Sequence, residues 1–234
     1  RQQQRASQDA LRFIAERELE PLHPIRIDRL RKQHVQELVN LRREAGASAN
    51  SLRLLRAALR AALNYAVSEE WLPKSQLNAA AETHTPTVPK TAPAYLRPHQ
   101  LPAFLEAIAK HPLRPLFLTT LLLALRPSEA LALRWNAVDL GPHPHVTIRG
   151  SIQHVGGQYH ERARPKDDDP RTIPIPEDVA AVLRDHRGDA DDSALVFRGQ
   201  RGGPLYEPWV NGQLRAVLAG AGLPRLTMYG LRHT

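Results

Sequence analysis

A single break between two apolar helical runs constrains this chain more than any other feature. Residues 121–140 read LLLALRPSEALALRWNAVDL, and their leucines are too apolar for a solvated helix. Pro127 cannot continue the first run, but it suits the first turn of a second helix, which we expect to end near Trp135. A helix start exposes unpaired N–H groups that favour an anion. Arg126 at this corner is therefore predicted either to hold phosphate or to form a structural ion pair with Glu129.

The composition excludes several classes of protein. The 234 residues include no cysteine, which excludes disulfides, thiolate zinc sites and a cysteine nucleophile and suits a cytoplasmic protein. No apolar run is long enough to cross a membrane, and the first ten residues lack the apolar core of a signal peptide. The chain does not begin with Met, so we expect a fragment of a longer protein.

The net charge of +8 indicates an acidic polymer as partner, or else an arginine-rich composition without a bound polyanion. Residues 1–80 carry helical apolar spacing in three segments, which begin near Ala10, at Ile27 and at Ser48. In the third segment, four polar side chains recur at steps of three and four and form one ridge: Arg53, Arg56, Arg60 and Asn64. Such a ridge fits the groove or backbone of double-stranded DNA, or is a solvated cationic face.

A proline-containing stretch separates this helical part from the rest. We place a semi-stiff linker at 81–96, long enough at ~3 Å per residue to span the width of a duplex. Residues 97–234 begin and end as helices. Between them the spacing of Val146, Ile148 and Ile152 predicts a strand, Gly156 and Gly157 a hairpin turn, and 171–175 an edge strand that contains Pro174. The predicted fold class is mainly α with a small antiparallel β-sheet.

Three segments in order resemble the tyrosine recombinase, or phage-type integrase, family. LALRPSEALALRW resembles the first arginine motif and makes Arg126 the matching arginine, and RPKDDDPRTIPIP resembles the lysine hairpin and makes Lys166 the matching lysine. YGLRHT resembles the His-x-x-Arg motif, with Arg232 as second arginine and Tyr229 in place of histidine. The resemblance implies a helical core-binding domain at 1–80, the linker, and an α+β catalytic domain at 97–234 that is incomplete at its C-terminus.

The resemblance implies recombination or integration of duplex DNA, typical of mobile elements, through a 3′-phosphotyrosyl intermediate. It implies that no metal or nucleotide cofactor is needed. The implied partners are double-stranded DNA and other recombinase protomers, and the implied location is the bacterial cytoplasm, in association with the nucleoid. The catalytic candidates are Arg126, Lys166, Tyr229 and Arg232. The family's nucleophilic tyrosine lies beyond its second arginine, so we expect it outside this sequence and the fragment to be inactive in cleavage. A degenerate, non-catalytic DNA-binding protein and a type IB topoisomerase are the alternatives.

Other motifs carry less chemistry. His143 and His145 have a spacing that metal ligands can use, but no third ligand is evident and a loop role is favoured. The run Asp167–Asp169 is predicted to be a solvated turn. Trp135 is expected in the core rather than as a surface for base stacking. For His233 a cap or hydrogen-bonding role is favoured over catalysis.

Overall fold

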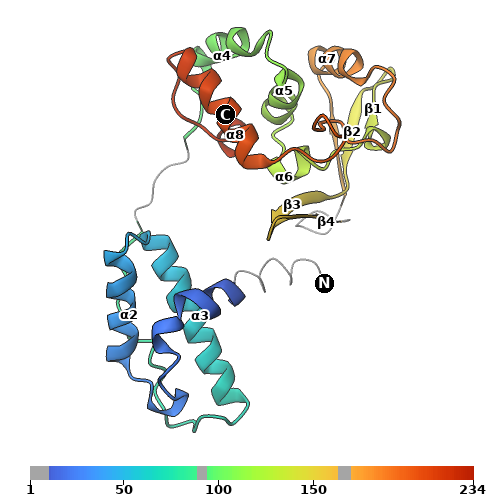
Figure 1. Cartoon of the computed structure of the whole chain (residues 1–234). Helices are drawn as coiled ribbons and strands as arrows, with labels where there is room; N and C mark the ends of the chain where they lie inside the picture. Colours follow the sequence, from blue (N-terminus) through green and yellow to red (C-terminus); the bar gives the residue numbers. More distant parts are fainter. Residues whose placement is uncertain (1–10, 89–93, 163–169) are drawn as a thin grey trace. The chain divides into compact units, whose positions relative to one another are not determined.

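Apolar side chains form two separate cores, one before and one after the proline-containing segment in sequence. The computed structural model describes residues 11–88, 94–162 and 170–234. Contacts divide the chain into a first unit, Arg1–Thr91, and a second unit, Ala92–Thr234. Among the described residues, Figure 1 shows helices in both units and strands only in the second, which confirms the predicted fold class. Lys166 lies outside the described residues.

Two helices form most of the first unit. They are α2 (Lys32–Glu44) and α3 (Ala49–Ser68), preceded by the short turns η1 (Ile14–Glu18), η2 (Glu20–Leu22) and η3 (Ile27–Arg29). The Ser48 hydroxyl caps α3 by accepting the Ser51 N–H at 3.1 Å. The predicted helix from Ile27 was wrong in its start, because the backbone is extended at Leu30, whose side chain enters the core.

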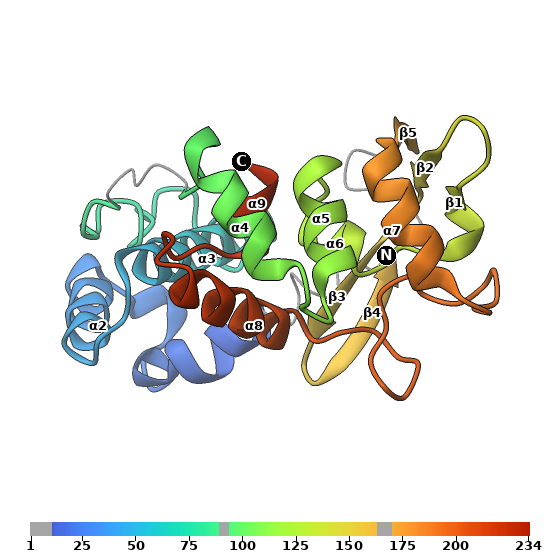
Figure 2. The same ribbon diagram turned by 90° about the horizontal axis from the view of Figure 1, so that it is seen from above.

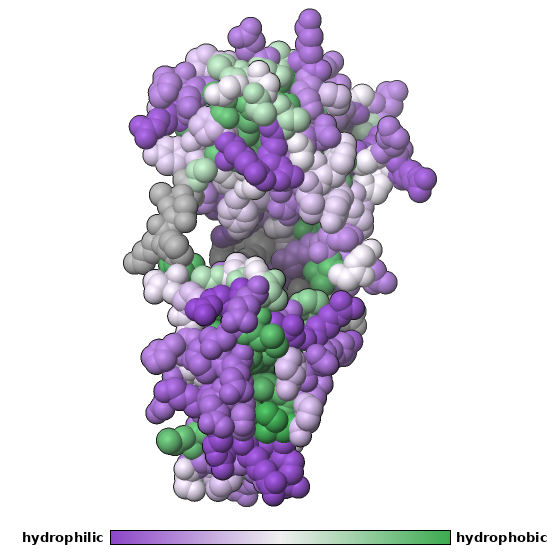
Figure 3. Space-filling model, turned by 60° about the vertical axis from the view of Figure 1, so that its left-hand side comes forward, coloured by the Kyte–Doolittle hydropathy of each residue, from purple (hydrophilic) through white to green (hydrophobic). Residues whose placement is uncertain are grey.

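The core of the first unit leaves apolar surface uncovered. Leu11 and Phe13 of the predicted N-terminal stripe are 51% and 52% exposed, so that stripe is not buried. Figure 3 shows a strip of hydrophobic side chains down this unit between hydrophilic borders. A groove of about 430 Å³ beside α2 has five apolar lining residues, Pro21, Leu22, Ile25, Leu38 and Leu41. A unit of this size buries a smaller fraction of its surface than a large domain does.

In the second unit, α5 (Arg114–Leu122) occupies the centre (Figure 2). Five consecutive residues from Leu116 to Thr120 are buried, as expected for so apolar a run. The helix contacts both α7 (Glu177–Arg187) and α9 (Met228–Arg232), while α4 (Leu101–Ile108) packs on α8 (Glu207–Gly220). The short η4 (Pro98–Gln100) leads into α4. The central helix α5 therefore supports α9, the element that contains Arg232, by packing against it.

The strands form two small antiparallel sheets. One has the order β1 (Val138–Asp139), β2 (His145–Ile148), β5 (Arg171–Pro174), and the other pairs β3 (Ser151–Val155) with β4 (Gln158–Arg162). The hairpin at Gly156 and Gly157 is confirmed, with φ of 57° and 81°. The prediction of one continuous strand through Val146 and Ile152 was wrong, because the chain passes from one sheet to the other at 149–150. Among the described strands β5 pairs only with β2, so its predicted edge position is confirmed.

The helix after the break is shorter than predicted. It is α6 (Pro127–Ala130), followed by a turn and η5 (Trp135–Ala137). The backbone of 133–135 bonds to 194–196 instead of continuing the helix, with Val196 N–H to Leu133 O at 2.7 Å and Trp135 N–H to Ala194 O at 3.1 Å. Trp135 is 2% exposed, which confirms its place in the core.

Gly230 is expected to be required for the close packing of α9 against Ala94 and Leu226. A Cβ there would lie 2.8 Å from the Ala94 carbonyl oxygen and 3.1 Å from Leu226 Cβ. Gly230→Ala should lower the free energy of unfolding by about 1–3 kcal/mol in chemical denaturation. Gly220→Ala at the end of α8 is the matched control, because its Cβ meets nothing within 4 Å. Equal stability of both variants would contradict this packing.

Candidate active site

One buried carboxylate brings together the side chains of three distant segments. Glu129 in α6 is 2% exposed. Its Oε2 accepts the backbone N–H of Arg126 at 2.9 Å, and its Oε1 accepts Nη1 of the Arg126 side chain at 3.0 Å. The ion pair considered for Arg126 is therefore present. Glu129 also caps the Arg126 N–H at the start of the four-residue α6, so this N–H is already bonded within the protein and the phosphate-holding role of Arg126 stays a prediction for its side chain.

Arg171, the first residue of β5, is the second partner of this carboxylate. Its Nη1 donates to Oε1 at 2.9 Å and its Nη2 to Oε2 at 2.6 Å, a two-pronged contact that fixes both groups. No sequence motif points to Arg171 as a site residue. The available signal was strand alternation, which places Arg171 on the same side of β5 as the half-buried Ile173.

Arg232 is the third arginine near the Glu129 carboxylate. Its Nη1 lies 3.9 Å from Glu129 Oε2, and its side chain is 27% exposed. Met228 N–H at the start of α9 donates to Asn211 Oδ1 at 2.8 Å, and Thr234 Oγ1 accepts the Leu96 N–H at 3.0 Å. These contacts hold both ends of α9, so the structure brings Arg126 and Arg232 to one place.

The surroundings of Glu129 keep it ionised. Burial alone would raise the pKa of its carboxyl group, but hydrogen bonds from Arg171 and Arg126 outweigh burial and lower the pKa below the ordinary value of 4.5. Three guanidinium groups thus meet a single carboxylate. Chemically, such a cluster attracts a further anion, and the forked geometry of arginine suits phosphate oxygens.

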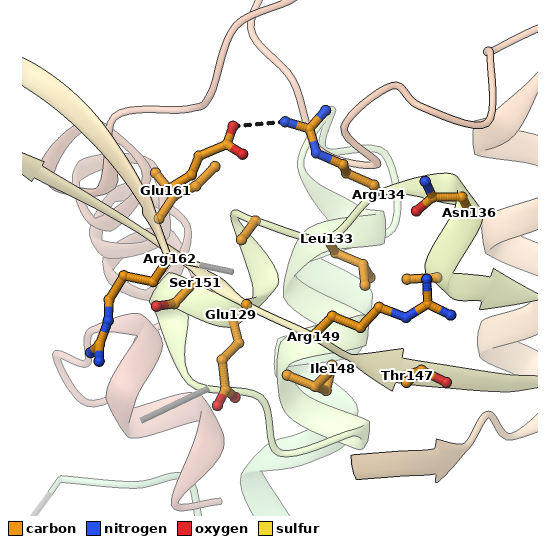
Figure 4. A pocket seen from close by; sticks show the side chains of 14 residues that line it. Glu129, Leu133, Arg134, Asn136, Thr147, Ile148, Arg149, Ser151, Glu161 and Arg162 are labelled. Atoms are coloured by element: carbon orange, nitrogen blue, oxygen red, sulfur yellow. Dashed lines mark hydrogen bonds and ion pairs between the residues drawn. The ribbon is translucent and has the colours of Figure 1, made fainter. Parts of the chain in front are cut away.

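A hollow of about 240 Å³ adjoins the cluster (Figure 4). Its lining includes Arg134, Arg149 and Arg162, and Arg134 Nη2 donates to Glu161 Oε1 of β4 at 2.7 Å. In Figure 4 the Glu129 carboxylate points away from this pair. The arginine-rich surface therefore extends beyond the cluster towards the β3–β4 hairpin.

The other catalytic candidates lie differently. Tyr229 is 50% exposed on α9, and its ring centre is 6.1 Å from that of His233. Lys166 cannot be placed, since it lies outside the described residues. Within the described ranges, no group of three or more histidine or acidic side chains is arranged to hold a metal. His145 Nδ1 instead lies 3.0 Å from the His143 carbonyl oxygen.

The ridge on α3 divides into two kinds of residue. Arg56 donates to the carbonyl oxygens of Ala80 and Ala81 at 2.9 and 2.6 Å. Asn64 Oδ1 accepts from the Asn78 amide at 2.6 Å. These two side chains therefore hold the segment that follows α3. Arg53 and Arg60 are exposed, and Arg53 Nη2 donates to Asn50 Oδ1 at 3.0 Å.

The fold is similar to that of solved DNA integrases. The Tn1549 transposon integrase in complex with a circular intermediate DNA superposes with a TM-score of 0.80 at 18% identity, covering 100% of this chain and 79% of that one. The lambda integrase tetramer bound to a Holliday junction has a TM-score of 0.65 at 16% identity, covering 88% and 58%. At such identities the similarity establishes the fold alone.

Sequence comparison identifies the family. Residues 94–234 match the phage integrase family, and the chain belongs to it. It is 23% identical to a XerC-like tyrosine recombinase of Caldanaerobacter subterraneus subsp. tengcongensis over 91% of this chain and 61% of that protein. It is 27% identical to tyrosine recombinase XerC of Brucella melitensis over 99% of this chain and 72% of that protein. The chain thus spans about three fifths of the first relative. In the described ranges no helix is long and apolar enough to cross a membrane.

Glu129→Gln should destabilise the fold at neutral pH. Because the folded-state pKa lies below 4.5, the unfolded chain takes up the proton first as the pH falls. The contribution of the carboxylate is thus complete above pH 4.5 and is lost as the pH falls through the folded-state pKa. We expect a difference in unfolding free energy of about 2–3 kcal/mol at neutral pH, discounted for the partly exposed arginines, that shrinks in acid.

Urea denaturation of both proteins across this pH range measures the effect. Glu177→Gln is the control, because Glu177 pairs with Arg184 while 71% exposed, and it should cost less than about 1 kcal/mol. A Glu129→Gln difference that stayed constant into acid would contradict an ionised, stabilising Glu129.

Proposed function

We propose that the protein is a site-specific DNA recombinase that cuts and rejoins duplex DNA. The observation that carries this proposal is the meeting of Arg126 and Arg232 at one buried carboxylate in a member of the phage integrase family. Support also comes from the two solved structures of similar fold described above, which are integrases in complexes with DNA. We propose duplex DNA and further recombinase protomers as partners, with residues 1–80 as core-binding domain, 81–96 as linker and 97–234 as catalytic domain.

The proposed reaction is a transesterification. The phenol oxygen of a tyrosine attacks the scissile phosphorus, a new P–O bond forms, and the bond from phosphorus to the 5′-oxygen breaks. The phenol gives up its proton to solvent water, and the departing 5′-oxygen gains one from a general acid. The product is a 3′-phosphotyrosyl link with a free 5′-hydroxyl group. One ester replaces another, so the step is balanced without a metal or nucleotide.

The two arginines have a specific task in this step. In the transition state, negative charge grows on the non-bridging oxygens of the phosphate. Arg126 and Arg232, fixed before the substrate arrives, bind this charge more tightly than the ground state, and that difference accelerates the reaction. Glu129 keeps them together against their mutual repulsion. Because the cluster is partly buried, the interaction is stronger than it would be in bulk water.

The remaining roles follow from residue chemistry. We assign Lys166 as the general acid that protonates the 5′-oxygen. Tyr229 orients the phosphate by a hydrogen bond, since a phenol with a pKa near 10 is a poor base at neutral pH. None of the five tyrosines in the sequence is proposed as nucleophile. By family resemblance that residue follows the second arginine, so the 234-residue chain alone is expected to bind without cleaving.

Substitution of either arginine should lower the rate of DNA cleavage much more than it lowers the affinity for duplex DNA. The product of the complete reading frame, mixed with nicked duplexes made from DNA that flanks its gene, should form a covalent protein–DNA band in denaturing gels. Arg126→Gln or Arg232→Gln should lower the rate of its formation by about 10²–10³-fold, with duplex affinity changed by only a few-fold.

Arg184→Gln is the control for this assay. Arg184 pairs with Glu177 and the Leu140 carbonyl oxygen, away from Glu129, so its loss should leave the rate unchanged. Duplex binding without any covalent product would instead favour a non-catalytic DNA-binding protein. Relaxation of supercoiled plasmid without joining of two sites would favour a topoisomerase.

The first unit should contribute phosphate contacts through the two exposed arginines of the ridge, Arg53 and Arg60. We expect the affinity of the 234-residue chain for duplex DNA to fall steeply with salt, because each phosphate contact releases counterions. The double variant Arg53→Gln, Arg60→Gln should reduce the slope of log affinity against log salt by about 2 in fluorescence anisotropy. Arg26→Gln is the control, as this exposed arginine pairs with Asp28. An unchanged slope in the double variant would exclude the ridge from the interface.

A further inference from the structure

The hydrogen-bonding capacity of the Glu129 carboxylate is fully used. An ionised carboxylate offers about four lone-pair sites on its two oxygens. Oε1 accepts Nη1 of Arg126 and Nη1 of Arg171, and Oε2 accepts the Arg126 backbone N–H and Nη2 of Arg171. Arg171 supplies two of the four bonds. No acceptor site is left for another donor.

Arg232 is the group excluded by this saturation. Its Nη1 stays 3.9 Å from Oε2, within reach of the charge but beyond hydrogen-bond distance. That nitrogen is buried and has no hydrogen-bond partner among the described residues. A buried donor without an acceptor is costly, so natural structures rarely keep one without a use.

We propose that Arg171 is a positioning residue that keeps the inner nitrogen of Arg232 available for the DNA phosphate. By occupying both oxygens of Glu129, Arg171 prevents Arg232 from satisfying itself on the same carboxylate. The buried Nη1 of Arg232 then takes its acceptor from outside, a non-bridging phosphate oxygen. This inference rests on the proposed function and deepens it, because it explains how a site containing a carboxylate stays receptive to an anion.

The backbone explains why Arg171 can do this reliably. Its position in β5 pairs with the buried Ile148 of β2, so the strand ladder fixes its Cα. Its guanidinium group approaches both carboxylate oxygens, a fork that a lysine cannot reproduce. Loss of Arg171 would open two acceptor sites on Glu129. Arg232 would need to move by only about 1 Å to make a hydrogen bond there.

The test measures sulfate binding to the 234-residue chain. Sulfate stands in for the phosphate group and keeps its charge across the pH range used. The Nε–Hε signals of Arg126 and Arg232, assigned by substitution in two-dimensional NMR spectra, report its binding. At neutral pH, Arg171→Gln should raise the sulfate dissociation constant about tenfold, whereas the control Arg184→Gln leaves it unchanged. Arg171→Lys should raise it at least about threefold, because an ammonium cannot hold both oxygens.

Two further readouts separate positioning from general damage to the fold. Adding Glu129→Gln to Arg171→Gln removes the competing carboxylate. Sulfate itself then supplies the counter-charge that brings Arg126 and Arg232 together, so most of the sulfate affinity should be recovered. In Arg171→Gln alone, sulfate affinity should improve as the pH falls and Glu129 takes up a proton, whereas in the wild type it should change little above pH 4.5. A damaged fold would show neither the recovery nor the pH dependence.

The outcomes are distinct. Unchanged sulfate affinity in Arg171→Gln, or no recovery on adding Glu129→Gln, overturns the inference. If circular dichroism shows that Arg171→Gln is unfolded, the sulfate affinity of Arg171→Lys is the deciding measurement. A wild-type sulfate affinity in Arg171→Lys overturns the inference. Sulfate binding that follows all these expectations, in a protein whose complete reading frame forms no covalent product with DNA, would instead overturn the recombinase proposal and leave the role of Arg171 intact.

Discussion

A buried carboxylate that must stay charged is the constraint on which the second unit depends. Glu129 is almost wholly removed from water, and an ionised group there is tolerated only when it is paired and hydrogen-bonded. Its partners come from the start of α6 and from β5, with Arg232 of α9 close by. One acidic side chain therefore ties three segments that are remote in sequence. A hydrophobic residue could fill the space but could not hold arginines together.

The same carboxylate connects folding to the proposed chemistry. Converging arginines repel one another, and without a counter-charge they would turn towards solvent. A carboxylate that neutralised them completely would compete with the phosphate. The structure lies between these extremes, since Arg171 saturates Glu129 and Arg232 remains within its field at 3.9 Å without a hydrogen bond. The proposed site is thus preorganised, and little reorganisation is required when charge develops on a substrate.

One helix face in the first unit combines side chains that stabilise the fold with side chains that we propose to contact DNA. At helical spacing the ridge of α3 looks uniform in sequence, yet Arg56 binds carbonyl oxygens of the following segment and Asn64 binds Asn78. Of the three ridge arginines, Arg53 and Arg60 are exposed, whereas Arg56 is partly buried. Long polar side chains beside a returning segment satisfy its backbone groups, because buried carbonyl groups need donors.

Sequence by itself determined the mainly helical class, the edge position of β5, the buried Trp135 and the family motifs, because these depend on local periodicity, proline chemistry and residue order. It did not determine where α6 ends or which side chain meets Glu129. The helix stops at Ala130 because residues 133–135 bond to 194–196, and Arg171 is delivered by pairing with β2. Both depend on contacts between distant segments, which local pattern does not encode and only the tertiary structure decided.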